Sequence, residues 1–244
     1  MTRLAVALLA VVVVGVIPAR AVPAAGAVDR AAGPGGFTFA VPAGWWNLSA
    51  DAPAANRDHV PTVFQEQARS GRYAFLAIDL DHGGDGFMEN VNAVVRSPTL
   101  PVPVTARFLD YLVLTIRAEM GRRGATYQCL DKKIVKIGDV EVGRLVAEVH
   151  DRDVVAKLIQ YFIPGSFSQA TLTFSTAPET FAHYEPVFDA AAQATLGAVT
   201  PYQVRPQVVL TQVIMGAVAA TIAVAVIVAR RRRAKKTPAA PPLT

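Results

Sequence analysis

Hydrophobic and polar residues alternate along several segments in the middle of the chain, a pattern typical of half-buried β-strands. We expect strands at residues 37–41, 73–80, 90–95, 127–137, 141–149, 154–163 and 170–174. Turn residues separate three of them closely, with Gly138-Asp139 in the first gap and Asp151-Arg152-Asp153 in the second. These gaps have the length of hairpin connections, so the three strands are predicted to be antiparallel neighbours.

A helix is predicted after Thr105, because apolar residues recur there every four positions and form one stripe. The stripe consists of Phe108, Leu112 and Ile116. Thr105 is a good N-cap residue, and we expect Gly121 and Gly124 to end the helix.

A second helix is predicted from Thr176, because residues 176–179 have the spacing of a capping box with proline in the first turn. Its expected packing face consists of Phe181, Tyr184, Phe188 and Ala192. Gly197 lies just beyond its expected end. Hairpinned strands and two separate helices together predict an α+β fold, an antiparallel β-sheet with helices packed on it.

The N-terminal apolar run, residues 4–17, follows Arg3 and has the length of the apolar region of an export signal. It is shorter than the ~17–25 residues that a membrane-spanning helix needs. Small residues after it give two cleavage positions, before Val22 or before Val28. We expect residues 1–27 to be a cleavable signal peptide, the competing interpretation being an uncleaved signal anchor.

A second apolar run, residues 208–229, contains no charge and reaches about 33 Å as a helix. That length matches a bilayer core of ~30 Å, and a backbone inside lipid must bond within its own segment. We therefore expect a transmembrane helix here, the alternative being a buried helix of a soluble core. Gly216 and Ala220 have the spacing that lets two such helices approach, so homodimerisation is an open alternative.

Basic residues directly follow this run and predict that the C-terminus is cytoplasmic. They are Arg230, Arg231, Arg232, Arg233, Lys235 and Lys236. The expected organisation is an extracytoplasmic domain at 28–197 with its core at 35–197, a stalk at 198–207 and a cytoplasmic tail at 230–244. The expected location is the cell membrane.

The charge distribution and the cysteine content limit the classes of function that the domain could have. The chain has a formal charge of +5, but residues 28–229 contain 16 basic and 19 acidic residues, a formal charge of −3. The basic excess belongs to the two ends, so we expect no binding to nucleic acid. Cys129 is the only cysteine, which rules out a disulfide within the chain. It either pairs between chains or packs inside a strand, and we favour packing.

Three segments carry a resemblance to a known family. Residues 37–45 read as a strand leading into a Pro-x-Gly-Trp turn, residues 169–175 as a strand leading into a helix, and residues 137–143 as the centre of a hairpin. The order of elements over roughly residues 35–197 resembles the PsbP-like superfamily, whose bacterial relatives include exported LpqN-type lipoproteins. The resemblance implies an α/β/α sandwich around an antiparallel sheet. It also implies a non-enzymatic binding or assembly role, with no cofactor and no catalytic residues to carry over. This chain lacks a lipidated cysteine and has the predicted C-terminal span instead.

Trp45 and Trp46 are the candidate contact residues for a partner or ligand. Neighbouring side chains of an extended segment point to opposite faces, so one of them would be buried and the other free to contact a protein, sugar or lipid. In the alternative, both fold over the edge of the sheet.

A weak candidate for a metal site consists of Asp79, Asp81 and Asp85, carboxylates near a glycine turn. The residues do not fit an EF-hand loop, because Gly83 and Asn90 occupy positions that need an oxygen ligand and a glutamate. A solvated loop with turn-forming residues is the competing interpretation.

No nucleophile motif accompanies these residues, and the four histidines have no pair at metal-ligand spacing. We therefore expect a membrane-anchored envelope protein whose extracytoplasmic domain is not an enzyme and binds a protein partner or a lipid-like ligand. The alternatives are a structural subunit of a membrane complex and an uncharacterised hydrolase.

Overall fold

A computed structural model of the 244-residue chain describes residues 30–49, 60–81, 87–97, 100 and 103–195. The predicted signal peptide, stalk, span and basic tail all fall outside these residues. Within the described part of the chain, no helix is both long enough and apolar enough to cross a membrane.

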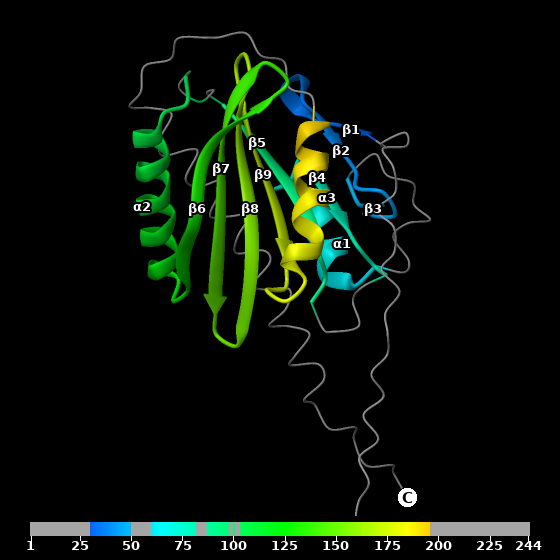
Figure 1. Cartoon of the computed structure of the whole chain (residues 1–244). Helices are drawn as coiled ribbons and strands as arrows, with labels where there is room; N and C mark the ends of the chain where they lie inside the picture. Colours follow the sequence, from blue (N-terminus) through cyan, green and yellow to red (C-terminus); the bar gives the residue numbers. More distant parts are fainter. Residues whose placement is uncertain (1–29, 50–59, 82–86, 98–99, 101–102, 196–244) are drawn as a thin grey trace, which may run out of the picture.

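Seven antiparallel strands form one sheet in the order β3-β4-β5-β9-β8-β7-β6 (Figure 1). Their bounds are Trp46–Asn47 for β3, Phe75–Ile78 for β4, Asn90–Arg96 for β5, Thr126–Ile137 for β6, Val140–Asp151 for β7, Val154–Pro164 for β8 and Gln169–Thr176 for β9. A second sheet pairs β1 (Arg30–Ala32) with β2 (Thr38–Ala40) around a short 3-10 turn, η1 (Pro34–Gly36). The antiparallel α+β architecture predicted from the residue pattern is confirmed.

Helix α3 (Phe181–Gln193) covers one face of the large sheet, beside the β1–β2 hairpin (Figure 1). The ring of Phe188 stacks on that of Phe174 in β9, with ring centroids 4.8 Å apart. The buried residues that meet α3 from the sheet include Val146, Ile159, Leu172 and Phe174. This apolar contact fixes α3 against the central strands.

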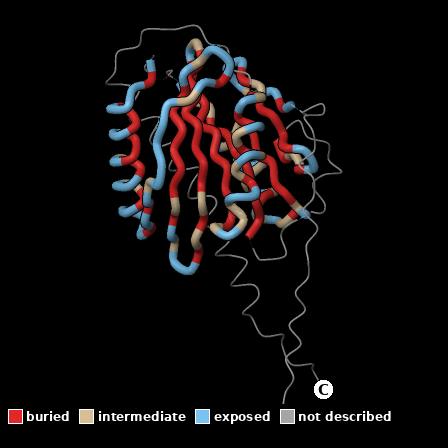
Figure 2. Tube along the Cα trace, viewed as in Figure 1, coloured by how far each residue is buried: buried red, intermediate tan, exposed pale blue. Residues whose placement is uncertain are grey.

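The other two helices pack on the opposite face. Helix α2 (Ala106–Arg122) covers β6, β7 and β8, and α1 (Thr62–Arg69) covers the β3–β4 side. Leu145 packs with α2 whereas its neighbour Val146 packs with α3, which shows that β7 is buried on both faces. Figure 2 shows buried residues running the length of the central strands, as a sheet between two helical layers requires.

The start of α2 and the predicted turns agree with the sequence pattern. Thr105 caps α2, its Oγ1 accepting a hydrogen bond from the backbone N–H of Phe108 at 3.2 Å. Gly124 follows the helix with a positive φ of 78°, and Gly138 has a φ of 58° in the β6–β7 turn. Both conformations favour glycine, because a Cβ crowds the backbone there.

The predicted start of α3 is wrong. The helix begins at Phe181, because Thr176 remains in β9, where it pairs with Lys157 of β8. The Thr176 hydroxyl donates to the carboxylate of Glu89, so it does not serve as a helix cap. The structure also contains β1, β3 and α1, which the pattern of hydrophobic and polar residues did not indicate.

Candidate functional site

Trp46 begins the short strand β3, Trp45 is the residue before it, and the two side chains pack into different apolar clusters. Trp45 is 9% exposed, and its ring meets those of Tyr184 and Phe188 on α3 edge-on, with centroids 6.1 and 6.0 Å away. Trp46 is half-buried and packs against the apolar cluster under α1. Trp45 is therefore part of the core, and Trp46 is the one with a partly exposed surface.

Asp79 connects the end of β4 to α3. One of its carboxylate oxygens accepts a hydrogen bond from the Tyr184 hydroxyl at 2.7 Å, and the other accepts the backbone N–H of Asp81 at 3.0 Å. Asp79 is buried and Asp81 is exposed, while Asp85 lies outside the described residues. In the described ranges no group of three His, Cys, Asp or Glu side chains is placed to hold a metal ion. The metal site stays a prediction.

A buried arginine, which the residue pattern did not single out, joins the sheet to α3. The Arg144 side chain on β7 is 3% exposed. Its guanidinium donates to Asp189 at 3.1 Å and to Glu185 at 2.7 Å, and lies 3.6 Å from Asp131 on β6. Glu185 and Asp189 are four residues apart on α3 and so share one helix face. The sequence feature that could have indicated this cluster is Arg144 itself, a charged residue inside an otherwise apolar strand.

The phenol of Tyr161 on β8 belongs to the same cluster. It donates to Asp189 and accepts a hydrogen bond from Arg144 Nε at 3.2 Å. Burial and then the hydrogen bond to Asp189 raise the pKa of Tyr161 above its usual range. Burial opposes the charge of Arg144, but its hydrogen bonds and the neighbouring carboxylate outweigh burial and raise its pKa. Both groups keep their protons at neutral pH. The ion pairs of Arg144 and the hydrogen bond of Tyr161 therefore hold α3 against the sheet.

Glu89 is fully buried at the start of β5, near the beginning of α3. Its Oε1 accepts hydrogen bonds from the hydroxyls of Thr176 at 3.1 Å and Thr180 at 3.0 Å. Thr180 is the residue before the first turn of α3, where a negative charge is favoured by the helix dipole. This carboxylate therefore positions the helix start.

On the face opposite α3, a row of buried polar side chains crosses the centre of the sheet. Tyr127 on β6 donates its hydroxyl to Gln160 on β8 at 3.2 Å, and Gln160 donates to Thr173 on β9 at 3.4 Å. Asn92 on β5 lies opposite Thr173 in the strand register. The row links three strands by side-chain hydrogen bonds inside the core.

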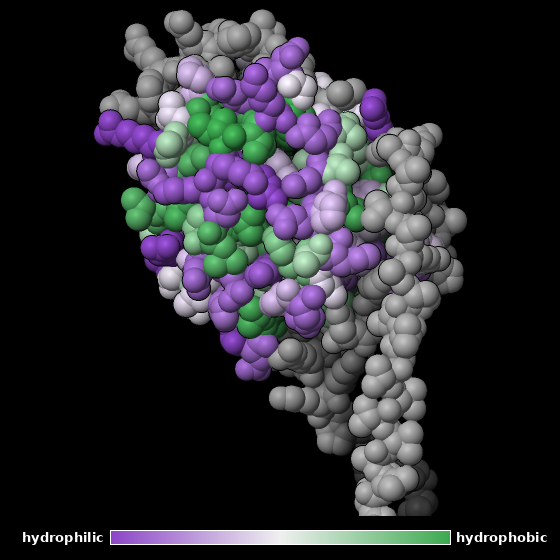
Figure 3. All heavy atoms as spheres, viewed as in Figure 1, coloured by the Kyte–Doolittle hydropathy of each residue, from purple (hydrophilic) through white to green (hydrophobic). Residues whose placement is uncertain are grey.

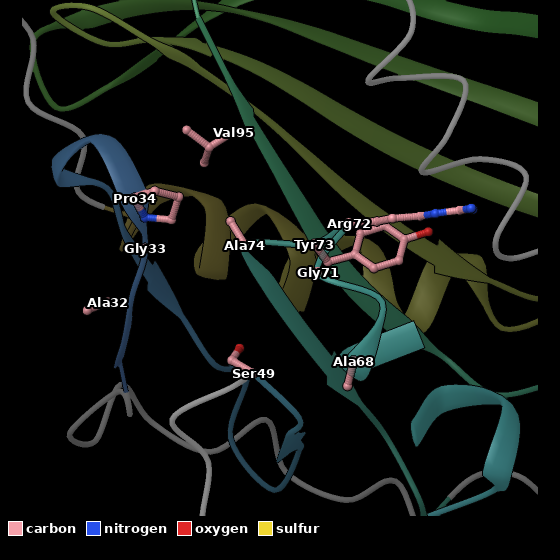
Figure 4. A pocket seen from close by; sticks show the side chains of 10 residues that line it. All are labelled: Ala32, Gly33, Pro34, Ser49, Ala68, Gly71, Arg72, Tyr73, Ala74 and Val95. Atoms are coloured by element: carbon pink, nitrogen blue, oxygen red, sulfur yellow. The ribbon is translucent and has the colours of Figure 1, made fainter. Parts of the chain in front are cut away.

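A cavity of about 530 Å³, open to solvent, lies between the β1–β2 hairpin, α1, the segment before β4, and β5 (Figure 4). Its lining comes from five parts of the chain: Ala32, Gly33, Pro34, Ser49, Ala68, Gly71, Arg72, Tyr73, Ala74 and Val95. In Figure 4 the hairpin residues stand on one side, and Arg72 and Tyr73 extend side by side at the other. Most lining residues have small side chains, polar atoms are also exposed in the walls, and the ionisable side chains are confined to one side.

Among the residues that line the cavity, Tyr73 has a shifted pKa. Burial raises the pKa of its phenol to about 12, and the positive charge of Arg72 partly opposes that shift. The Ser49 hydroxyl oxygen accepts the backbone N–H of Leu76 at 3.3 Å, so it is fixed in the wall by β4. No short motif could have predicted this cavity, because its lining residues are far apart in the sequence.

Cys129 and the histidines lie elsewhere. Cys129 is half-buried on β6, packs against the core under α2, and donates weakly to the carbonyl of Asp131 at 3.4 Å. Burial raises the pKa of its thiol, which keeps the sulfur protonated. His150 and His183 are exposed on β7 and α3, and the other two histidines are outside the described residues.

No family model matches the sequence, and no curated protein matches it either. Solved structures do match. The structure of PsbP (CyanoP) from the cyanobacterium Synechocystis is 14% identical with a TM-score of 0.48, covering 70% of this chain and 92% of that one. The structure of LpqN from Mycobacterium tuberculosis, described as involved in cell envelope biogenesis, is 11% identical with a TM-score of 0.43, covering 71% and 93%. PsbP and LpqN, to which the sequence resemblance pointed, are thus among the solved structures that this chain matches.

Proposed function

We propose that this chain is a single-pass membrane-anchored envelope protein whose extracytoplasmic domain binds an amphiphilic, lipid-like ligand without transforming it. The sequence supports the anchoring half of the proposal. Residues 4–17 and 208–229 have the lengths of an export signal and a membrane span, and six basic residues follow the second run.

The cavity beside the β1–β2 hairpin is the observation that carries the binding half. Its volume of about 530 Å³ lies in the range of ligand pockets, ~300–1,000 Å³. Small side chains in the wall leave room for part of an acyl chain, polar atoms of the lining can hydrogen-bond, and Arg72 with Tyr73 at one side suits a polar or anionic headgroup. An amphiphile has both parts in the same molecule.

The deeply buried ionisable residues have structural contacts elsewhere. Arg144 and Asp189, Glu89 and Thr180, and Asp79 and Tyr184 each connect α3 to the sheet or to the strand ends. Two of the ten residues that line the cavity, Arg72 and Tyr73, are ionisable. This arrangement supports recognition of a headgroup by charge and hydrogen bonding.

The test begins with full-length protein extracted from its own membrane in mild detergent. Native mass spectrometry and lipid analysis then identify what co-purifies. We expect a stoichiometric amphiphile with the unaltered chain and its loss in Ala68→Trp, because an indole at this lining position obstructs the cavity. The matched control is Ala118→Trp, which places the same side chain on the exposed face of α2.

Equal ligand content in the two tryptophan variants would refute binding at this cavity. A stoichiometric protein in place of a lipid would identify the domain as an assembly factor. Turnover of a substrate that single substitutions abolish would establish an enzyme. Extraction of the chain by an alkaline wash without detergent would refute the membrane anchor.

A further inference from the structure

Phe167 is 76% exposed in the turn between β8 and β9. Among the described phenylalanines it is the only one that is strongly exposed, whereas Phe37, whose ring lies against Gly165 of the same turn, is 1% exposed. A large apolar side chain in water is unfavourable unless another apolar phase receives it, and an aromatic ring suits the boundary between water and lipid.

The turn that presents Phe167 is well supported. The backbone N–H of Gly165 donates to the carbonyl of Ser168 at 2.7 Å, which closes the turn. The η1 turn packs against it so tightly that a Cβ on Gly35 would lie 2.3 Å from Ser168 Oγ. Residues 33–37 and 164–169 contain no charged side chain. We call these two turns together the Phe167 end of the domain.

The chain leaves the described domain at this same end. Gln193, in the last turn of α3, donates its side-chain amide to the carbonyl of Lys136 at 2.7 Å, next to the β6–β7 turn. That turn and the β8–β9 turn share one end of the sheet, because Gly143 pairs with Phe162 in the register (Figure 1). The cavity also reaches this end, since Pro34 belongs both to its wall and to η1.

The length of the segment between α3 and the predicted span indicates which end of the sheet lies nearer to the membrane. Residues 196–207 separate Thr195 from the first residue of the span. Even fully extended, twelve residues span no more than about 40 Å. The β7–β8 turn lies at the other end of β8. This strand has 11 residues, so the turn is about 35 Å from the Phe167 end.

We infer that the Phe167 end is a lipid-facing surface that rests on the bilayer, with Phe167 in the region between headgroups and acyl chains. The inference rests on the anchoring proposed above. It deepens the proposed function, because it places the cavity wall at Pro34 beside the membrane from which an amphiphile would come. The face that carries α3 is less suited to lipid, because Figure 3 shows its apolar side chains as separate patches among polar ones.

The experiment uses the full chain in lipid nanodiscs of phosphatidylcholine, with Cys129→Ala removing the native thiol. A nitroxide label is attached at Ser166→Cys, at Asp153→Cys in the β7–β8 turn, or at Leu114→Cys on α2, an exposed position on the side of the domain. Collision with oxygen, which partitions into lipid, is compared with collision with a water-soluble nickel complex. We expect the label at 166 alone to favour oxygen, and Phe167→Ser to abolish that preference.

A water-like label at 166 in a chain that stays in the membrane overturns the inference and leaves the anchor intact. Lipid contact at 114 without contact at 166 also overturns it, because the domain would then lie on its side. A chain that leaves the membrane in an alkaline wash refutes the anchoring itself. A Phe167→Ser variant that keeps its lipid contact shows that the phenyl ring does not hold the domain to lipid.

Discussion

Arg144 on β7 and Asp189 on α3 form an ion pair across the interface between sheet and helix, with Nε and Oδ1 3.1 Å apart. The arginine side chain is almost fully buried, whereas the aspartate is 45% exposed. The two partners therefore contribute unequally. The buried positive charge of Arg144 depends on the neighbouring carboxylates for compensation, whereas the Asp189 carboxylate can be hydrated by solvent.

This asymmetry predicts different losses of stability for two substitutions. Arg144→Met should lower the free energy of unfolding by about 2–3 kcal/mol, less than a fully buried pair because the carboxylates are partly hydrated. Asp189→Asn should lower the free energy of unfolding by about 1 kcal/mol, because Glu185 and Tyr161 still bind the guanidinium. Thermal unfolding of the full chain in mild detergent measures both. A larger loss in Asp189→Asn would contradict the assignment of Arg144 as the central group.

Tyr184→Phe isolates one buried hydrogen bond. The phenol donates to Asp79 at 2.7 Å, and its ring stacks with Phe188, so the substitution removes the bond and keeps the ring. The buried carboxylate then loses the hydrogen bond from the phenol, and we expect a loss of about 2 kcal/mol in unfolding free energy. Tyr111→Phe, on the exposed side of α2, is the matched control. Equal unfolding midpoints for the two variants would show that the bond contributes nothing to stability.

The two tryptophans should give different fluorescence. Trp45 is buried against α3, so Trp46→Phe should leave a chain whose emission is blue-shifted and poorly quenched by iodide. Trp45→Phe should leave a chain with emission at longer wavelength and stronger quenching, because Trp46 is only half-buried. Trp45→Ala should also destabilise the domain by about 3–5 kcal/mol, as loss of a large core side chain does. Similar quenching of the two single-tryptophan chains would contradict the placement of Trp45 in the core.

The large elements of the fold could be predicted because their signals are local. Alternation of side chains indicated β5 to β9, and the stripe that includes Leu112 together with the cap at Thr105 indicated α2. The start of α3 could not be predicted in this way. Thr176 has the spacing of a cap, but pairing with β8 and a hydrogen bond to Glu89, 87 residues away, keep it in the sheet.

The candidate site was harder to predict than the fold. Trp45 and Trp46 were recognised as a pair, but their separation into core and half-buried positions depends on the pairing of β3 with β4. The cavity joins Pro34 to Val95 and so depends on how a hairpin meets a distant sheet edge. No periodicity or motif within one segment carries that information.

Alkaline pH should destabilise the domain through Tyr73, whose folded-state pKa is raised to about 12 by burial. In the unfolded chain a tyrosine titrates near pH 10, so below that pH the phenol is protonated in both states and contributes no pH dependence. From about pH 10 to about pH 12 the unfolded state binds fewer protons than the folded state. Stability therefore falls as pH rises, by about 1.4 kcal/mol per pH unit.

The contribution of Tyr73 is measured by comparing the unaltered chain with Tyr73→Phe in urea unfolding from about pH 9 to about pH 11.5. Burial also raises the pKa of Tyr127 and of Tyr161, so both chains should lose stability in this range. The unaltered chain should lose more, with a difference of up to about 2 kcal/mol at the alkaline end. Parallel pH curves would show that the Tyr73 phenol is as hydrated in the folded chain as in the unfolded one. The cavity wall at the Tyr73 phenol would then be open to water.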